Sequence, residues 1–226
     1  MFENLKNEID FFIRSKTKFS KKNFVETDEK LIEINISQNK YFREIFEQYF
    51  FKNKKDNLQI LDIGSKNWFY VKSMHEFFSS FSSSFTLDGV EIDGYRLYSN
   101  LYSRFEVAKY YIKDLKNTNY IVDNLFNLNK KYDYITWFLP FVTIEPHKAW
   151  GLPEKYFNPE KMFNHALSLL NSGGQMLIVN QGEKERDIQK QMLINSKIHF
   201  EFLGEIKNEF YQFENKRYGF IVRNFE

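Results

Sequence analysis

A turn within residues 57–70, NLQILDIGSKNWFY, carries the side chains best placed for ligand chemistry. A short apolar run is interrupted by Asp62 and ends at Gly64, and a polar turn then leads into an aromatic-rich segment. Such a turn leaves backbone amides free, and a following helix presents partial positive charge to an anionic group. Gly64 has no Cβ, so the backbone can approach a ligand closely. The turn is therefore typical of a nucleotide-binding crevice.

Acidic and amide side chains also follow two later strand-like runs. Glu91 and Asp93 come at the end of one run, and Asp123 and Asn124 come at the end of another. A carboxylate at the end of a strand can chelate the two hydroxyls of a ribose, as an acidic residue does in dinucleotide sites. Glu91 is placed for this role, whereas Asp93 is better suited to cap the helix that follows.

Glu145 and His147 are the candidates for a general base. Both lie in residues 139–157, a segment rich in proline and aromatic residues. In an alternating α/β chain this segment should cover the carboxyl ends of the strands, where ligands bind. A carboxylate or an imidazole there can take a proton from a reacting group.

The elements that must position these residues alternate between strand-like and helix-like patterns from residue 57 onward. Strands are predicted at 58–63, 86–92, 119–123, 132–138, 175–181, 199–206 and 218–225. Helices are predicted at 67–81, over a segment with Leu97, Leu101, Phe105 and Ala108 on one face, from Asn158 and Pro159 to a stop at Ser172–Gly174, and at 183–197. This order predicts an α/β fold: a mainly parallel, doubly wound, seven-stranded sheet with an antiparallel C-terminal strand.

The first 54 residues are predicted to form an N-terminal helical cap, and residues 55–226 the main domain. Phe2, Leu5, Ile9 and Phe12 recur at helical spacing, and a second apolar stripe comprises Phe42, Ile45, Phe46, Tyr49 and Phe50. Between the stripes lies a basic segment, residues 14–22. We interpret it as a solvated linker, with contact to an anionic substrate as the alternative.

Composition excludes several kinds of site. The chain has 226 residues, a net charge of +2 and no cysteine, which removes disulfides, thiolate nucleophiles and iron–sulfur clusters. Its four histidines show no metal-binding spacing, so no metal site is expected. The N-terminus has acidic residues where a signal peptide needs an apolar core, and no run of about 18 apolar residues occurs. We therefore expect a soluble, cytoplasmic protein with no membrane partner.

Five motifs in order resemble those of the class I S-adenosylmethionine-dependent methyltransferases. LDIGSKN is similar to their first motif, and GVEID to the acidic end of their second strand. VDNLF resembles the third-strand end, YDYITWFLP the fourth-strand motif, and LLNSGGQMLIV the step into the fifth strand. The resemblance covers about residues 57–226. It implies a Rossmann-like domain that uses S-adenosylmethionine as its cofactor.

The resemblance also implies roles for individual residues. The cofactor loop would be formed by Asp62, Gly64, Ser65 and Lys66, the ribose would be held by Glu91 with Asp93 beside it, and the adenine amino group would face Asp123 or Asn124. Trp137 would line the sulfonium through a cation–π contact.

The first motif departs from the family pattern at Lys66 and Trp68, where glycine is usual. We interpret Lys66 as a possible partner of the methionyl carboxylate, with a solvent-facing lysine as the alternative. If the two side chains block the loop, the fold would persist without binding cofactor.

The function implied is methyl transfer to an unidentified acceptor, expected to be a small molecule. Residues 138–141, FLPF, offer no amide to hold a planar amino group, which argues against the acceptors of the family's adenine-, cytosine- and amide-directed members. A nucleic acid or a protein acceptor is left open, and the sequence indicates no oligomeric state. Two alternatives are an aminopropyl transferase on the same fold and a non-catalytic relative that binds a nucleotide or a partner.

Overall fold

The computed structural model describes residues 29–98 and 101–224, with side chains described from residue 33 onward. The predicted helix around Phe2 to Phe12 and the basic segment at 14–22 lie outside the described residues. Within the described part, none of the helices is both long and apolar enough to cross a membrane.

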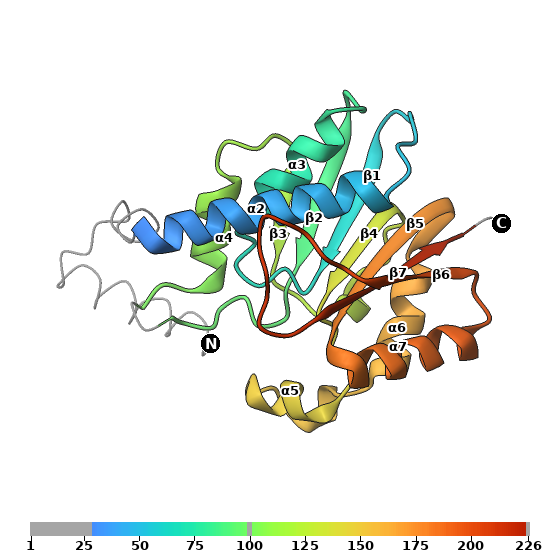
Figure 1. The fold of residues 1–226 in the computed structure, drawn as a ribbon. Helices are drawn as coiled ribbons and strands as arrows, with labels where there is room; N and C mark the ends of the chain where they lie inside the picture. Colours follow the sequence, from blue (N-terminus) through green and yellow to red (C-terminus); the bar gives the residue numbers. More distant parts are fainter. Residues whose placement is uncertain (1–28, 99–100, 225–226) are drawn as a thin grey trace.

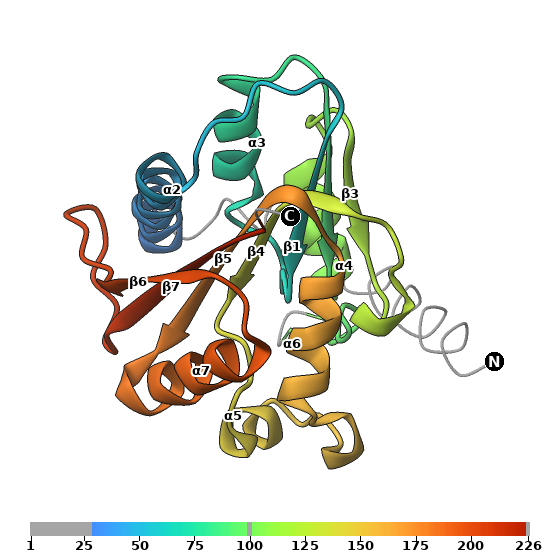
Figure 2. The ribbon, with the colours of Figure 1, turned by 90° about the vertical axis from the view of Figure 1, so that its right-hand side faces the viewer.

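Seven strands form one sheet with the order β3-β2-β1-β4-β5-β7-β6 (Figures 1 and 2). All pairings among the first five strands of this order are parallel, and β7 runs antiparallel to both β5 and β6. The predicted mainly parallel sheet with an antiparallel C-terminal strand is therefore confirmed. The strands span β1 Leu58–Ile63, β2 Phe85–Val90, β3 Thr118–Ile121, β4 Tyr132–Phe138, β5 Leu170–Gln181, β6 Phe200–Glu205 and β7 Arg217–Arg223.

Helices cover both faces of the sheet, as Figures 1 and 2 show. One apolar cluster joins α2, α3 and α4 to one face, and a second cluster joins α6 and α7 to the other. Short α5 lies at the bottom of Figure 1, beyond the strand ends. The helices span α2 Glu29–Tyr49, α3 Val71–Ser79, α4 Arg104–Ile112, α5 Ile144–Ala149, α6 Pro159–Ser168 and α7 Gly182–Ser196, with short 3-10 turns η2 Leu125–Asn127 and η3 Glu154–Tyr156.

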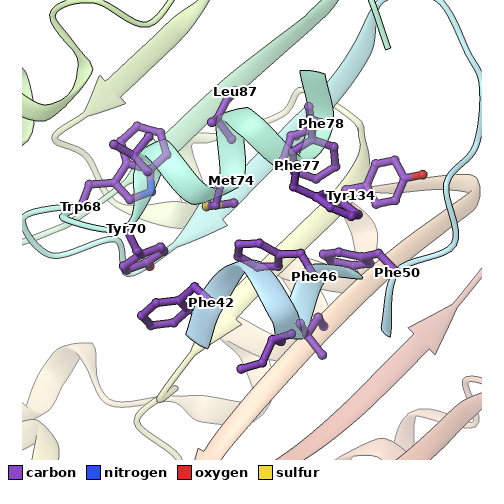
Figure 3. Close-up of a cluster of buried hydrophobic side chains, with 14 of the residues drawn as sticks. Phe42, Phe46, Phe50, Trp68, Tyr70, Met74, Phe77, Phe78, Leu87 and Tyr134 are labelled. Atoms are coloured by element: carbon purple, nitrogen blue, oxygen red, sulfur yellow. The ribbon is translucent and has the colours of Figure 1, made fainter. Parts of the chain in front are cut away.

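Aromatic rings pack between α2 and α3 (Figure 3). Phe42 stacks on Tyr70 with ring centroids 4.3 Å apart, and Phe46 and Phe50 lie 5.8 and 6.1 Å from Phe77. Offset and edge-on pairs of this kind contribute about 0.5–1.5 kcal/mol each beyond the area they bury. The predicted second stripe thus forms a helix and packs into the main core. The division of the chain at residue 54 stays a prediction.

Two helix predictions were wrong at their starts. The helix expected over 67–81 begins only at Val71, because residues 64–70 form a tight turn. The helix expected to include Leu97 and Leu101 begins at Arg104. Leu97 instead pairs in an isolated bridge, and Leu101 has a left-handed φ of 66°.

The start of α4 also overturns the capping role considered for Asp93. Ser103 occupies the N-cap, where its side chain accepts a hydrogen bond from the Glu106 backbone N–H. The Glu106 carboxylate accepts from the Ser103 backbone N–H at 3.0 Å in return, which completes a capping box. Asp93 lies ten residues before this cap and cannot serve it.

The glycine pair after α6 does not stop the helix as expected. N-cap Asn158 and Pro159 begin α6 as predicted, but the helix ends at Ser168. Residues 170–174 already belong to β5, whose pairing with β4 shifts register between Tyr132 and Tyr134. The glycines therefore accommodate an irregular stretch of strand.

Candidate functional site

A cavity of about 490 Å³ opens at the carboxyl ends of the central strands. This volume lies in the range of small-molecule sites, about 300–1,000 Å³. Eight of the expected site residues line it: Gly64, Ser65, Lys66, Glu91, Asp123, Asn124, Trp137 and His147. Three others, Asp62, Asp93 and Glu145, do not line it. The fold thus gathers most of the predicted site at one place.

The loop after β1 adopts a left-handed backbone at three positions, two of which carry large side chains. Gly64, Lys66 and Trp68 have φ angles of 70°, 54° and 52°, all in the left-handed region. Two backbone hydrogen bonds fix this loop: Gly64 N donates to Val90 O of β2 at 2.9 Å, and Trp68 N donates to Ser65 O across a turn at 2.8 Å. Positions 66 and 68 therefore have the φ for which glycine is the usual residue, but with side chains attached.

The Trp68 side chain does not block the cavity. It is fully buried and packs against the sheet beside β2. Its six-membered ring occupies the space above Gly89, where an added Cβ would lie 2.8 Å from three indole atoms. Trp68 therefore does not close the loop, because its indole fills the volume that a side chain at residue 89 would need.

Lys66 lies at the cavity wall with its ammonium 5.6 Å from the centroid of the Trp150 ring. The residue as a whole is exposed, but its ammonium group is partly desolvated. This desolvation lowers the pKa of the ammonium, and the nearby Arg104 charge lowers it further. Glu91 acts in the opposite direction. In the part of the chain that the structure describes, Lys66 forms no ion pair within 4.0 Å. The side chain is therefore available to an anionic ligand.

Glu91 is a buried carboxylate held by the loops on either side of it. One oxygen accepts from the Lys66 backbone N–H at 2.9 Å, and the other accepts from the Asp93 backbone N–H at 2.9 Å. Arg104 Nη1 lies 3.9 Å from Oε1. Each carboxylate oxygen can accept more than one hydrogen bond. Glu91 is thus oriented by its neighbours and keeps acceptor capacity for a ligand.

Trp150, at the C-cap of α5, is a wall residue that sequence reasoning did not single out. The Arg104 guanidinium lies 4.4 Å from its ring centroid, within cation–π range. Arg96 donates to the Trp150 carbonyl, and its Nε lies 2.5 Å from Asp93 Oδ2. Asp93 therefore positions the arginines that hold the Trp150 wall, rather than lining the cavity. Such tertiary cation–π contacts carry no spacing signal in the sequence.

Asp62, in β1, is fully buried beneath the loop that follows this strand, and it does not line the cavity. Its carboxylate accepts from the Tyr70 hydroxyl at 2.6 Å and from Thr136 Oγ1 at 2.5 Å. Burial raises the pKa of Asp62 to about 7, against the lowering effect of these two hydroxyls and of the nearby Trp68 indole. The indole N–H itself makes no hydrogen bond of normal geometry with a described residue. Asp62 thus fixes Tyr70, which does line the cavity.

Asp123 and Asn124 both line the cavity after β3, and their local bonds differ. Asn124 Oδ1 accepts from the Phe126 backbone N–H at 3.1 Å and caps η2. Asp123 Oδ1 accepts from the Asn124 backbone N–H and from Asn127 Nδ2, both at 2.7 Å. The Asn124 oxygen is committed to its cap, whereas Oδ2 of the exposed Asp123 accepts no hydrogen bond from the described residues. Asp123 is therefore the side chain better able to accept from a ligand.

The two general-base candidates lie in different places. Glu145 is exposed on α5 and pairs with Lys184 at 3.3 Å, outside the cavity. His147 is buried in the cavity wall, and its Nε2 lies 3.0 Å from the Pro153 carbonyl. A carbonyl can only accept, so Nε2 carries a proton in this contact, and in the neutral ring Nδ1 then has the lone pair. Trp137 lines the same cavity from the end of β4. Of the two candidates, only His147 lines the cavity.

No group of three or more acidic or histidine side chains suited to a metal ion occurs among the residues that the structure describes.

No family model matches the chain, and no curated protein matches it either. Solved structures do. An S-adenosylmethionine-dependent methyltransferase from Aquifex aeolicus is similar with a TM-score of 0.56 at 12% identity, over 87% of this chain and 94% of that one. The plantazolicin methyltransferase BpumL, solved with S-adenosylhomocysteine, is similar with a TM-score of 0.51 at 15% identity, over 98% of both chains. Magnesium protoporphyrin IX methyltransferase from Synechocystis, solved with bound S-adenosylmethionine, has a TM-score of 0.51 at 13% identity, over 96% of both chains.

These likenesses, together with the strand order, define the class of fold. The chain has the Rossmann-like fold of the class I S-adenosylmethionine-dependent methyltransferases. This agrees with the resemblance found in its motifs.

Proposed function

We propose that the protein is an enzyme that transfers a methyl group from S-adenosylmethionine to a small-molecule acceptor. One observation carries the proposal: a single cavity joins the Gly64 loop, the Glu91 carboxylate and Asp123, which follow three adjacent parallel strands. The carboxyl ends of such strands are where this fold class binds nucleotides. Two similar solved structures, one with S-adenosylhomocysteine and one with S-adenosylmethionine, support a cofactor of this kind.

The residues present fit the cofactor. A Cβ built at Gly64 meets nothing within 4 Å, so the backbone there faces open cavity that a side chain would fill. Glu91 would accept from the ribose hydroxyls and Asp123 from the adenine amino group. Ile92, which is 41% exposed, would cover one face of the base together with Leu125. Lys66 would pair with the methionyl carboxylate, and Trp137 would lie near the sulfonium.

The bound cofactor supplies an electrophilic methyl group whose transfer leaves a neutral thioether. The protein positions the acceptor for this in-line displacement and excludes water from it. When the acceptor is an O–H or N–H group, its proton must leave as the new bond to carbon forms. His147 Nδ1 is the group in the cavity wall suited to take that proton, with the ring held by the Pro153 carbonyl and by Phe141 and Phe157.

The cavity favours methyl transfer to a small apolar acceptor over the alternatives. Its wall beyond β4 is mainly aromatic and includes Phe138, Phe141, Tyr156 and Phe157. Another part of the lining carries Arg217, a cation that would repel the polyamine of an aminopropyl transferase. A non-catalytic role requires no open loop, yet Trp68 is folded away and Gly64 is uncovered.

Thermal unfolding with S-adenosylhomocysteine, S-adenosylmethionine and NAD tests the proposal. A ligand at a hundredfold excess over its Kd stabilises the native state by about 2.7 kcal/mol, which raises Tm by about 5–11 °C in a chain of this size. We expect this shift with the first two ligands and none with NAD. The Glu91→Gln variant should lose about half of the shift or more. Equal Tm values with and without both adenosyl ligands would contradict the proposal.

A further inference from the structure

The far end of the cavity, beyond the proposed cofactor residues, is polar. There Arg217 at the start of β7 pairs in register with Gln181 at the end of β5 (Figure 1 shows the two strands side by side). Tyr41 from α2 and Glu185 from α7 line the same end. None of these four side chains belongs to the residues proposed to hold the cofactor.

Arg217 presents one free edge of its guanidinium. Nη1 donates to Gln181 Oε1 at 2.9 Å and to the Asn215 carbonyl at 3.2 Å. Neither Nε nor Nη2 donates to any residue that the structure describes. The guanidinium lies 4.4 Å from the centroid of the Phe213 ring, so one of its faces is covered. Nε–H and Nη2–H lie along one edge and match the two oxygens of a carboxylate.

The Arg217 charge is also uncompensated at close range. Among the described residues no carboxylate lies within 4.0 Å of it. Partial burial lowers the pKa of the guanidinium by desolvation. Glu185 is the nearest acidic group of the cavity, but its Oε2 accepts from the Gln181 backbone N–H at 3.0 Å, and burial raises its pKa. A partly desolvated cation of this kind is stabilised when an anion binds.

Tyr41 adds a second donor. Only 3% of the residue's surface is exposed, and its hydroxyl has no hydrogen-bond partner in the described structure. Desolvation raises the pKa of this hydroxyl, and the nearby Arg217 charge acts in the opposite direction. A buried hydroxyl without a partner destabilises the native state, and a bound acceptor atom would offset that loss.

We propose that Arg217 and Tyr41 bind the carboxylate of the methyl acceptor, which is therefore an apolar or aromatic molecule with one negative charge. The inference rests on the proposed function and names its substrate class. One cation beside one neighbouring carboxyl, Glu185, suits a monoanion better than a phosphate dianion. From β4, beside the proposed sulfonium position, to β7 is two strand spacings, about 10 Å. The acceptor carries its carboxylate at about that distance from the atom that is methylated.

Matched acid and amide probes test the site. Calorimetry on the S-adenosylhomocysteine-loaded protein compares benzoate with benzamide, naphthoate with naphthamide, and hexanoate with hexanamide. A hydrogen bond to a charged group predicts that at least one acid binds about 10- to 100-fold more tightly than its amide. Arg217→Gln should abolish this preference, and Arg217→Lys should restore part of it. Tyr41→Phe should reduce it.

Arg186→Gln is the matched control, because Arg186 lies next to Glu185 on α7 but pairs with Asp187 outside the cavity. It should keep the preference for the acid. The proposal is overturned if no acid binds more tightly than its amide, or if Arg217→Gln keeps the wild-type preference. S-adenosylhomocysteine affinity is measured on every variant, and the probes are repeated without it. Failure of the cofactor to bind is thereby distinguished from failure of the carboxylate site.

Discussion

Replacing Gly64 by alanine separates the cost of folding from the cost of binding. Gly64 has a φ of 70°, and a Cβ built on it meets nothing within 4 Å. The new methyl group would therefore clash with no protein atom and would occupy cavity space. We expect Gly64→Ala to fold with little loss of stability and to bind S-adenosylhomocysteine poorly.

The two magnitudes follow from this geometry. A left-handed conformation costs an L-residue roughly 1–2 kcal/mol, and the stiffer unfolded chain of the alanine variant offsets roughly 0.4–1 kcal/mol of it. The net loss is about 1 kcal/mol, or about 2–4 °C in Tm for a chain of this length. The methyl group keeps the ligand from close contact with the backbone, and we expect at least a ~10-fold loss of affinity, about 1.4 kcal/mol.

Two glycine variants serve as controls, with denaturation and calorimetry applied to all three proteins. Gly173 has a φ of 73° and an equally open Cβ position, but it lies outside the cavity. Gly173→Ala should lose the same stability and keep full affinity. Gly89→Ala should lose more stability, about 1–3 kcal/mol, since its Cβ would lie 2.8 Å from the Trp68 ring. If Gly64→Ala binds as tightly as Gly173→Ala, the assignment of the cofactor loop is refuted.

Three further predictions concern the same region. Glu91→Gln should weaken S-adenosylhomocysteine binding about 10- to 100-fold in calorimetry, because the ribose hydroxyls lose a charged acceptor; unchanged affinity would remove Glu91 from the site. Lys66→Ala should weaken binding at low salt and much less at high salt, since screening reduces an exposed ion pair, and calorimetry at both salt levels checks this. Asp62 has a pKa raised from 3.8 to about 7 in the folded state, so the native protein holds a proton that the unfolded chain releases between those values. Its contribution to stability is therefore present below pH 4 and is lost as the pH rises to about 7. Urea denaturation should show this decline in the wild type and a flatter profile in Asp62→Asn; equal slopes would contradict it.

Local signals in the sequence were sufficient where one element could be recognised by itself. The buried run of β1 and the Asn158–Pro159 start of α6 were both predicted correctly. The order of such elements also predicted the sheet, because alternation leaves few ways to connect parallel strands. Of the site, Glu91 and Asp123 could be placed because strand ends gather at one edge.

Other features depended on competing or tertiary interactions. Leu97 and Leu101 matched helical spacing, yet the capping box of Ser103 and Glu106 begins α4 after them; the S-x-x-E pattern was the signal that could have found this start. Six-residue α5 is too short for a periodic pattern, so Trp150 was not assigned to a wall. Arg217 reaches the cavity only through the antiparallel pairing of β7, which brings distant residues together.

The packing of Trp68 against Gly89 has a consequence for how this chain relates to its fold class. Where such a cofactor loop usually has glycine, this chain has Trp68, and the residue that must be glycine is Gly89 on the neighbouring strand, 21 positions away in the sequence. The large side chain at 68 and the absent side chain at 89 together fill one space between the loop and β2. We therefore expect substitutions at the two positions to be coupled, because a small residue at 68 would open the space that a side chain at 89 needs. A sequence motif that covers only the cofactor loop does not include residue 89, so the dependence between the two positions is visible only in the three-dimensional structure.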